Sequence, residues 1–586
     1  MPPDGRQRRA VRRGRRGATL RADRRPGPRR PPVLRTTCRR MLGPALFAAV
    51  AAARAAEPEM LTYTLRPDPG TGRIRVELTW RTAGREDSTF GVSPRWGNAG
   101  EIEPLLQDLQ CDGAVVAARE RGAWTLRHRR DAVIRVTYIV QPPGRTLTWA
   151  RSHVPVVTAE YFHGVGHTFL VTPLPGGGMP DTYEVLLRWD VPRDWTALCS
   201  WAAGRGVGDR LRPDDIRHSA YVAGRLRTLS RDVPGVGPLT VALPARLAFP
   251  ADQFAELAAG LIRDQCRFMQ ESAFPPFTVL VVPIDEPLPR GTTSLSGTGL
   301  YHSFVLFVPP ETRLGDNVEH LFAHELLHYW NGGVLVAEEP DELVYWFTEG
   351  FTDYFALRIL FESGRWDAAT YAKWLNRHLR AYNANPARNA TNAQIQARFW
   401  KDRDTVGEVP YQRGLLLGLR WQALSRQRGV EDGVGKLFRH LLARARSGEF
   451  RLTNDRIREA GRSVLGDWFT AEFARFVEAA ETVEVPPDAL APALTGAIRK
   501  VYEFQLGFDR EASLAAQQVK GLISGSAAAK AGLREGDELA GWDIHGEADQ
   551  EIRLQVRRGD KLQTIRYYPR GAAVEILQFK PSASPS

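Results

Sequence analysis

Alternating polar and apolar positions dominate the chain from residue 57 onward. Three runs show the alternation most clearly, at 73–78, 133–138 and 183–189, and glycine and proline separate such runs from one another. A period of two places one face of a strand in a core and the other in water. The pattern therefore predicts an antiparallel β-domain over residues 57–243.

Helical spacing of apolar residues takes over further along the chain. Residues 250–272 predict an amphipathic helix, 277–283 a buried strand and 366–480 a mostly helical region. We therefore expect a mostly helical domain over 244–495 and a small β-rich domain over 496–580. The fold class predicted is multidomain α+β.

The first 56 residues have a different character. Arg39-Arg40 precede an apolar run at 41–53, and Ala53 and Ala55 place small residues at the −3 and −1 positions of a cleavage site. This order is typical of a secretory signal peptide and weakly similar to a twin-arginine signal. We expect an exported protein, periplasmic or secreted. The apolar run is shorter than the ~20 residues of a membrane span, and we expect no span in the mature chain.

The positive charge of the chain belongs to this leader. Residues 1–40 hold 15 arginines and two acids, and Arg54 adds a further charge, so the net charge of +12 becomes −2 for a chain beginning at Glu57. We therefore predict no nucleic-acid partner. Cys38 would leave with the leader, and the three remaining cysteines lie too far apart in sequence to form a zinc motif. The sequence does not decide whether one disulfide forms among Cys111, Cys199 and Cys266.

The motif His-Glu-Leu-Leu-His at 324–328 carries the strongest chemical signal. On a helix, His324 and His328 lie on the same face about one turn apart. Both imidazoles can then reach one Zn²⁺, and Glu325 is placed to activate a water at the metal.

The flanking residues favour a helix at this motif. Asp316 or Asn317 can cap its start, apolar residues follow with helical spacing, and Gly332-Gly333 can end it. His320 lies one turn before His324 and could compete as a ligand. Because no glutamate follows it, a supporting or surface role is favoured for His320.

A second helical pattern begins at Pro340 and supplies carboxylates. Glu349 on this helix can serve as the third ligand, since two histidines and a glutamate leave the fourth zinc position open. Asp353 lies one turn further on and suits an acceptor for the free ring N–H of a ligating histidine. The prediction is one zinc per chain.

The segments at 324–332 and 346–354, His-Glu-Leu-Leu-His-Tyr-Trp-Asn-Gly and Trp-Phe-Thr-Glu-Gly-Phe-Thr-Asp-Tyr, resemble thermolysin-like zinc peptidases. They are most similar to the bacterial glycyl aminopeptidase family, which combines an N-terminal β-domain, a catalytic domain and a PDZ domain. The resemblance implies the same three ligands, Glu325 as general base and Asp353 as their support.

A further segment extends the resemblance. Related aminopeptidases carry Pro-Tyr-x-Lys-Gly, whose tyrosine hydrogen-bonds the tetrahedral oxyanion. Here Pro-Tyr-Gln-Arg-Gly stands at 410–414. The resemblance implies Tyr411 as that donor, with Arg413 in place of the usual lysine.

The sequence departs from these enzymes at the anchor for the substrate's α-amine. Related enzymes place a glutamate on an edge strand in a Gly-rich segment, whereas 291–303 here contains no acid. The strand expected at 304–308 can still pair with an extended peptide. Glu338 and Glu339 are the nearest acids in sequence. Aminopeptidase and endopeptidase activity therefore both stay open.

The end of the chain resembles a PDZ domain. Leu506, Gly507 and Phe508 are similar to a carboxylate-binding loop, and 526–539 matches a short helix with its following strand. Little room remains between Ile544 and the strand at 552–556 for a groove-lining helix. Docking of a peptide C-terminus and docking of another domain are both compatible with this pattern.

The favoured function is zinc-dependent hydrolysis of peptides by an aminopeptidase outside the cytoplasm. A zinc endopeptidase and a non-catalytic PDZ-type binding protein are the alternatives. Glu325 argues against the binding protein, because a purely structural zinc needs no base.

Overall fold

The computed structural model describes residues 59–582, apart from 177, 287–294, 449 and 545. The predicted leader with its cleavage site, Cys38, part of the Gly-rich segment and the last residues of the chain lie outside the described residues.

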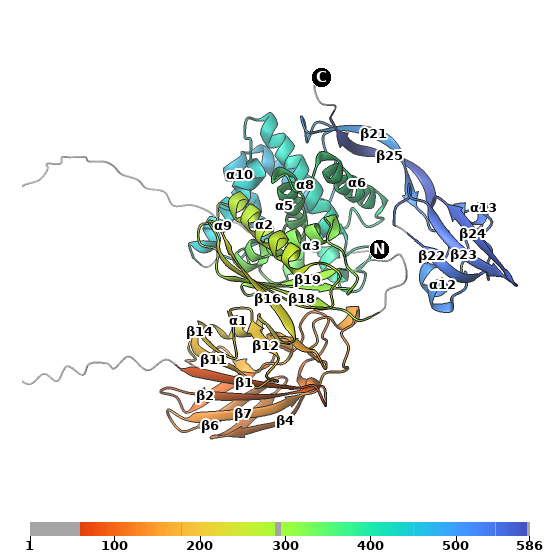
Figure 1. Ribbon diagram of the computed structural model, residues 1–586. Coiled ribbons are helices and arrows are strands. Elements are labelled where there is room, and N and C mark those ends of the chain that lie inside the picture. The colour runs from red at the N-terminus through yellow and green to blue at the C-terminus, as the bar shows by residue number, and fades with distance from the viewer. Residues whose placement is uncertain (1–58, 177, 287–294, 449, 545, 583–586) are drawn as a thin grey trace, which may run out of the picture. The chain divides into compact units, whose positions relative to one another are not determined.

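Three sheets make up the N-terminal β-domain, coloured red to yellow in Figure 1. The first has the order β14-β11-β1-β2-β7-β4, with β14 Gly206–Leu211, β11 Tyr183–Trp189, β1 Met60–Asp68, β2 Arg73–Arg81, β7 Val133–Val140 and β4 Leu106–Asp112. The second is β10-β3-β6-β5, with β10 Thr172–Pro173, β3 Asp87–Gly91, β6 Ala123–His128 and β5 Ala114–Glu120. The third is β13-β12-β15-β9-β8, with β13 Ala202–Ala203, β12 Thr196–Cys199, β15 Ala220–Gly224, β9 Tyr161–Val165 and β8 Val156–Val157.

The three alternating runs of the sequence are strands β2, β7 and β11, as predicted. Pairing in this domain is antiparallel except between β1 and β11, which run parallel. Their alternate apolar residues are buried and form one core, because each strand turns one face inward.

A fourth sheet carries the next part of the chain. Its order is β16-β17-β18-β20-β19, with β16 Leu226–Val233, β17 Gly237–Pro244, β18 Phe277–Pro283, β20 Ser303–Val308 and β19 Ser296–Leu300. Because β16 and β17 pair with β18, this sheet extends across residue 243, where the sequence predicts a domain boundary, and that boundary stays a prediction. The strand expected at 304–308 is β20, which is interior, and the edge strand is β19.

Both faces of this sheet are covered, which explains the unbroken apolar run of β18. Val279 and Val281 enter the core of the helical domain, whereas Leu280 and Val282 join a cluster with residues of the third sheet. The sheet is therefore a shared wall between two cores.

Helices build the remainder of this domain (Figure 1). They are α2 Ala251–Met269, α3 Asp316–Leu327, α4 Tyr345–Thr348, α5 Gly350–Glu362, α6 Ala368–Ala384, α7 Asn392–Arg398, α8 Val409–Gln427, α9 Gly433–Arg446, α10 Asn454–Leu465 and α11 Trp468–Phe473. Shorter helical turns are α1 Pro213–Arg217, η1 Glu103–Leu105, η2 Trp149–Arg151, η3 Gly166–Thr168, η4 Tyr329–Val334, η5 Asp341–Val344 and η6 Ala474–Glu478. The helical pattern predicted over 366–480 is confirmed.

The C-terminal part is β-rich. It pairs β21 Leu494–Phe504 with β25 Arg570–Pro581, and forms a three-stranded sheet from β22 Glu538–Asp543, β23 Ile552–Arg558 and β24 Lys561–Tyr567. Its helices are α12 Arg510–Ala516 and α13 Ala527–Lys530. Between β22 and β23 the described residues form no helix, in line with the short spacing of the sequence.

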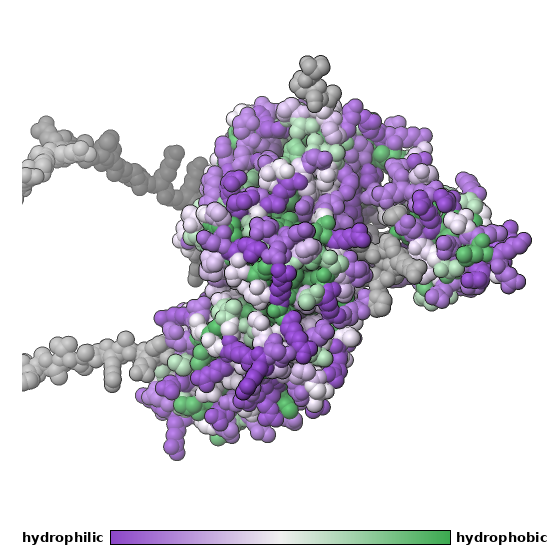
Figure 2. All heavy atoms as spheres, in the orientation of Figure 1, coloured by the Kyte–Doolittle hydropathy of each residue, from purple (hydrophilic) through white to green (hydrophobic). Residues whose placement is uncertain are grey.

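Among the described residues, no helix is both long and apolar enough to cross a membrane. On the face shown in Figure 2, hydrophilic residues predominate and apolar ones form small groups. The three described cysteines are free thiols, so the disulfide that the sequence left open does not form among them.

A buried histidine of the third sheet packs against the fourth. His163 on β9 is fully buried, and both its ring nitrogens lack a hydrogen-bond partner among the described residues. Its ring lies edge-on to Phe307, with 5.5 Å between ring centroids. Burial, with a smaller effect of His153, lowers the pKa of His163 from 6.5 to about 3. The folded protein therefore holds this ring neutral.

We expect stability to fall as the pH drops below the unfolded-state pKa of His163. Between 6.5 and about 3, the unfolded chain binds a proton that the folded chain cannot. The loss for this group is up to about 1.4 kcal/mol per pH unit. H163Q removes the titration, so its thermal midpoint should drop less than that of the unsubstituted protein between about pH 7 and about pH 5. Equal drops would contradict the prediction.

Candidate metal centre and catalytic site

Helix α3 carries the His-Glu-Leu-Leu-His motif, as predicted. It begins after Gly315 without a side-chain cap, so the cap expected from Asp316 or Asn317 is wrong. The Asp316 carboxylate instead accepts a hydrogen bond from Trp374 Nε1 at 3.1 Å and pairs with Lys373. The chain leaves the helical path at Asn331 and Gly332, and the φ of 139° at Gly332 suits glycine.

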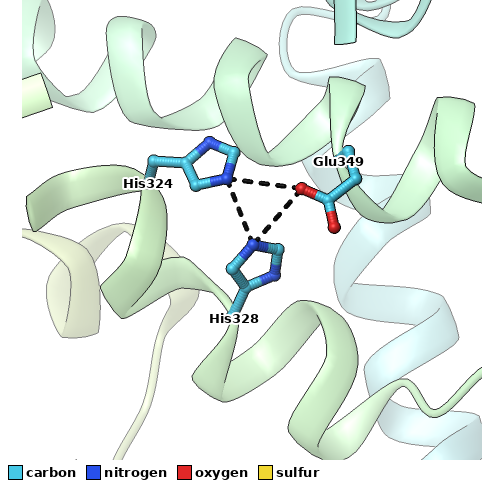
Figure 3. Close-up of side chains that lie close together, drawn as sticks. All are labelled: His324, His328 and Glu349. Carbon is cyan, nitrogen blue, oxygen red and sulfur yellow. Dashed lines mark hydrogen bonds and ion pairs between the residues drawn. The ribbon is translucent and has the colours of Figure 1, made fainter. Parts of the chain in front are cut away.

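Three candidate ligand atoms converge between α3 and the junction of α4 with α5 (Figure 3). The Nε2 atoms of His324 and His328 are 3.1 Å apart. Glu349 Oε2 lies 3.4 Å from the first and 3.5 Å from the second. All three side chains point toward one common position (Figure 3).

Hydrogen bonds on the far side of each ring fix which nitrogen carries the proton. His324 Nδ1 lies 2.8 Å from Asp353 Oδ1, and His328 Nδ1 lies 3.0 Å from the carbonyl oxygen of Asn331. Both partners only accept, so both Nδ1 atoms are donors in the neutral rings. Each Nε2 then presents a lone pair, and two lone pairs facing each other at 3.1 Å favour a cation between them.

The triangle of donor atoms fits zinc. Bonds of about 2.0–2.1 Å in tetrahedral geometry separate neighbouring ligand atoms by about 3.3–3.4 Å. The observed separations run from 3.1 to 3.5 Å. The three residues would hold the ion and leave a fourth position for water or substrate.

The carboxylates and imidazoles of the centre shift one another's pKa values. Burial opposes ionisation, yet His328 and His324 hold the pKa of Glu349 far below its usual range. Burial lowers the pKa of His324, but Asp353 and Glu349 outweigh it and raise that pKa well above 6.5. The carboxylates thus make this pocket strongly attractive to positive charge.

Asn331 joins the two ligand-bearing segments, a role that the sequence analysis missed. Its side-chain Nδ2 donates to the carbonyl oxygens of Phe347 and Thr348 at 2.9 and 3.2 Å and to Thr352 Oγ1 at 3.0 Å. Its own carbonyl holds His328. Asn331 lies inside the segment 324–332 that carries the family resemblance. Its position directly before two glycines was the one sign in the sequence of a structural role.

Glu349 stands at a break between α4 and α5, and glycines allow a third helix to approach it. A Cβ atom on Gly350 would lie 2.5 Å from Gly414 Cα and 2.5 Å from the Pro410 carbonyl oxygen. Only glycine fits such a crossing. The contact sets the start of α8, and with it Tyr411, beside the metal ligands.

The Tyr411 ring lies nearly parallel to the His324 ring, with 6.1 Å between centroids. Burial and the nearby Glu349 raise the pKa of Tyr411 well above 10. The phenol therefore keeps its proton and can donate a hydrogen bond near the ligands. Arg413 points elsewhere: it is fully buried and donates to the carbonyl oxygens of Arg388 and Ala390 at 2.8 and 2.5 Å.

Glu325 packs against edge strand β19. A Cβ atom on Gly297 would lie 2.8 Å from Glu325 Cγ, and one on Gly299 would lie 3.3 Å from its carbonyl oxygen. Burial raises the pKa of Glu325, while His328 and His324 counteract it. A carboxylate with a raised pKa is a better proton acceptor, which suits a general base. The Gly-rich sequence of β19 is thus explained by this close contact.

His320 supports the centre and contributes no ligand atom to it. Its Nε2 lies 3.2 Å from Asp353 Oδ1, and its ring stacks on Trp374 with 4.3 Å between centroids. Asp353 thus lies between two histidines of α3.

Residues 317–408 match the M61 glycyl aminopeptidase family. The match contains the three candidate ligands, Glu325 and Asp353, and it supports a metallopeptidase. It agrees with the resemblance found in the sequence over that segment. The thermolysin-like grouping and the PDZ assignment stay predictions.

A solved structure with low sequence identity has a similar fold. The chain matches an aminopeptidase N family protein from Idiomarina loihiensis with a TM-score of 0.63 and 15% identity, covering 89% of this chain and 98% of that one. It also matches an M1 zinc metallopeptidase from Deinococcus radiodurans with a TM-score of 0.46 and 14% identity, covering 74% and 97%. A comparison with curated proteins gave no match.

Several acids lie between α3 and α4 in sequence. Glu338 and Glu339 are exposed. Asp341 is half-buried and accepts a hydrogen bond from Tyr345 Oη at 3.2 Å. Burial and its neighbours Glu339 and Glu342 raise the pKa of Asp341 to about 6. Tyr345 links this carboxylate to the centre, because its carbonyl oxygen accepts the Glu349 backbone N–H at 2.9 Å.

Residues 506–508, the predicted carboxylate loop, contact the rest of the C-terminal part through buried side chains and carbonyl oxygens. Leu506 and Phe508 are buried, and the Leu506 carbonyl accepts a hydrogen bond from Tyr567 Oη at 2.7 Å. Gly507 has a φ of 89°, and its carbonyl accepts the Ile523 N–H at 2.8 Å. The strand β25 instead contacts α6, where Asn376 Nδ2 donates to Phe579 at 2.8 Å.

Proposed function

We propose that this protein is a zinc-dependent aminopeptidase that acts on peptides outside the cytoplasm. The observation that carries the proposal is the convergence of two imidazole lone pairs and the Glu349 carboxylate at tetrahedral spacing. Glu325 stands beside this centre without being one of its donors. A purely structural site would have no use for such a base.

Bound zinc would act as a Lewis acid, polarising the scissile carbonyl and acidifying a water molecule. Glu325 accepts the proton of that water and returns it to the leaving amine. Tyr411 donates a hydrogen bond to the carbonyl oxygen as negative charge develops there. His324 keeps its orientation through Asp353, and His328 through the Asn331 carbonyl.

Strand β19 supplies the backbone for substrate alignment. It is the edge of the sheet and pairs only with β20 among the described strands. Its free edge can pair with an extended peptide. The glycines of β19 bring that edge close to Glu325 and His328.

The amine of the substrate needs a carboxylate, and Asp341 is our candidate. No basic side chain forms an ion pair with it among the residues described, and its hydroxyl partner Tyr345 begins α4, the helical turn that ends at Glu349. A buried ammonium without a carboxylate is costly. D341N should therefore raise KM more than it lowers kcat.

Acetylation of the substrate's N-terminus tests the aminopeptidase assignment. An acetylated peptide has no ammonium for an acid anchor, so its cleavage should fall to background while the matched free peptide is cut. Product analysis by mass spectrometry gives both the rate and the bond cleaved. Equal cleavage of both peptides at internal bonds would replace the aminopeptidase by an endopeptidase and leave the metal centre intact.

Tyr411→Phe tests the oxyanion donor. The variant keeps the ring beside His324 and removes only the hydroxyl, so kcat should fall roughly 10²–10³-fold with little change in KM. Zinc content should be unchanged. A kcat within about twofold of the unsubstituted protein would exclude Tyr411 from this role.

Two further parts of the proposal concern where the protein acts and what its C-terminal part does. The signal-like leader at 39–55 supports action in the periplasm or after secretion. For the PDZ-like part we propose docking onto the catalytic domain, supported by the hydrogen bonds between Asn376 and Phe579 and between Arg380 and Gln578.

A further inference from the structure

A cavity of about 510 Å³ opens directly beside the candidate metal centre. Tyr411 and Asp353 form the wall that it shares with the centre. The rest of its lining comes from Leu295 just before β19, from the first turns of α3, from α6 and from the start of α8. Asp341 and Tyr345 do not line it. The cavity and the proposed amine anchor are therefore separate features of the site.

The walls of the cavity combine apolar surface with one basic side chain. Leu321, Trp374 and Ala381 supply apolar surface, and Arg377 lies at the exposed rim. The guanidinium lies over the Trp374 ring, 5.5 Å from its centroid. Such stacking orients an arginine while leaving its N–H donors free.

Arg377 differs from its neighbours on α6 in having no acidic partner. Lys373 pairs with Asp316, and Arg380 pairs with Glu547 at 2.7 Å. Among the described residues, no carboxylate forms an ion pair with Arg377. Asp353 in the same cavity is hydrogen-bonded by His324, and His320 Nε2 lies 3.2 Å from its carboxylate. Glu408 is close enough for Arg377 to influence it electrostatically, without an ion pair between them.

A second unpartnered group lines the same cavity. His378 Nε2 is buried and has no hydrogen-bond partner among the described residues. Burial lowers the pKa of His378 to about 4, so the neutral ring can donate or accept one hydrogen bond. A buried polar atom without a partner calls for a ligand or water.

We propose that this cavity receives the residue after the scissile bond and that Arg377 binds the C-terminal carboxylate of a short peptide. The inference rests on the proposed peptidase function and assigns its substrate class, di- and tripeptides with a free C-terminus. Because hydrolysis releases the C-terminal fragment, a carboxylate anchor defines this cavity as the leaving-group side. The guanidinium fork matches a carboxylate in a way that an ammonium does not.

Matched peptides test the chemistry of recognition. Tripeptides of one sequence are prepared with a C-terminal carboxylate and with a C-terminal amide, and a third peptide carries aspartate in its last position with an amide. For the unsubstituted protein, kcat/KM should favour the free acid over the amide about tenfold or more, mainly through KM. If the amidated aspartyl peptide matches the free acid, the carboxylate is that of a side chain, and the assignment to the C-terminus is overturned.

Variants locate the anchor. R377A should bring the ratio of acid to amide close to one, and R377K should restore part of it, because lysine keeps the charge and loses the fork. R380A is the matched control on the same helix, since Arg380 already has an acidic partner, and it should keep the ratio. An unchanged ratio in R377A would overturn the proposal.

A binding measurement separates this inference from the proposed function. Calorimetric titration of the E325Q variant with the acid and the amide reports recognition without turnover. Tighter binding of the acid that disappears in the E325Q/R377A double variant supports the anchor even if hydrolysis is slow. Equal binding of acid and amide refutes the anchor. Absence of any peptide hydrolysis by the unsubstituted zinc-loaded protein refutes the proposed function instead.

Discussion

Glu325→Gln is expected to lower kcat by roughly 10²–10⁴-fold, the range that a general acid–base group contributes. The amide is isosteric with the carboxylate, so the packing against Gly297 and Gly299 is kept. The glutamine side chain cannot take a proton from water. Because Glu325 is not among the converging donor atoms, zinc content should stay at about one ion per chain.

The comparison of rate and metal content is what makes this variant informative. Steady-state kinetics on a free peptide gives kcat, and elemental analysis of the same sample gives zinc. Normal turnover by E325Q would show that another group takes the proton. Loss of zinc together with activity would contradict the prediction that Glu325 acts as a base without binding the metal.

His328→Ala is expected to remove most of the bound zinc and with it the peptidase activity. The substitution deletes one of three donors and leaves only His324 Nε2 and Glu349 to bind the ion. A site with two protein donors binds the ion far more weakly than one with three. Elemental analysis after dialysis against buffer without zinc measures the loss.

His320→Ala is the matched control for this experiment. His320 occupies the same helix one turn before His324, and it contacts Asp353 and Trp374 instead of the donor triangle. The control should retain its zinc. Full zinc in H328A, or equal loss in both variants, would contradict the assignment of the ligands.

Local patterns predicted the elements that carry the centre. The buried strand expected at 277–283 is β18 residue for residue, because covered sheets read as unbroken apolar runs. The spacing of His324 and His328 predicted their convergence, since helical periodicity is set by the backbone alone. Glu349 was predicted as a carboxylate on a second helix, whereas the structure places it at the break between α4 and α5.

Contacts between distant segments set the features that the sequence did not predict. The residues of β16 and β17 do not show which sheet these strands join, and only their pairing with β18 assigns them to the fourth sheet. Asp316 was expected to cap α3 but binds Trp374 and Lys373 of α6. The edge position of β19 follows from sheet order, which a strand's own residues do not encode.

The same limit applies to the candidate site. Gly350 and Gly414 lie far apart in sequence, and their crossing places Tyr411 beside His324. Arg413 matches a motif position yet points into the core, where it binds the carbonyl oxygens of a loop. Arg377 belongs to no sequence motif. It stands out only in the structure, where Lys373 and Arg380 on the same helix each pair with an acid.

Zinc titration of the metal-stripped protein tests the central claim most directly. Peptide hydrolysis is measured as zinc is added back to protein treated with a chelator. Activity should be absent at the start, rise in proportion to zinc and level off at about one ion per chain. Hydrolysis by the stripped protein at the rate of the zinc-loaded one would contradict the account.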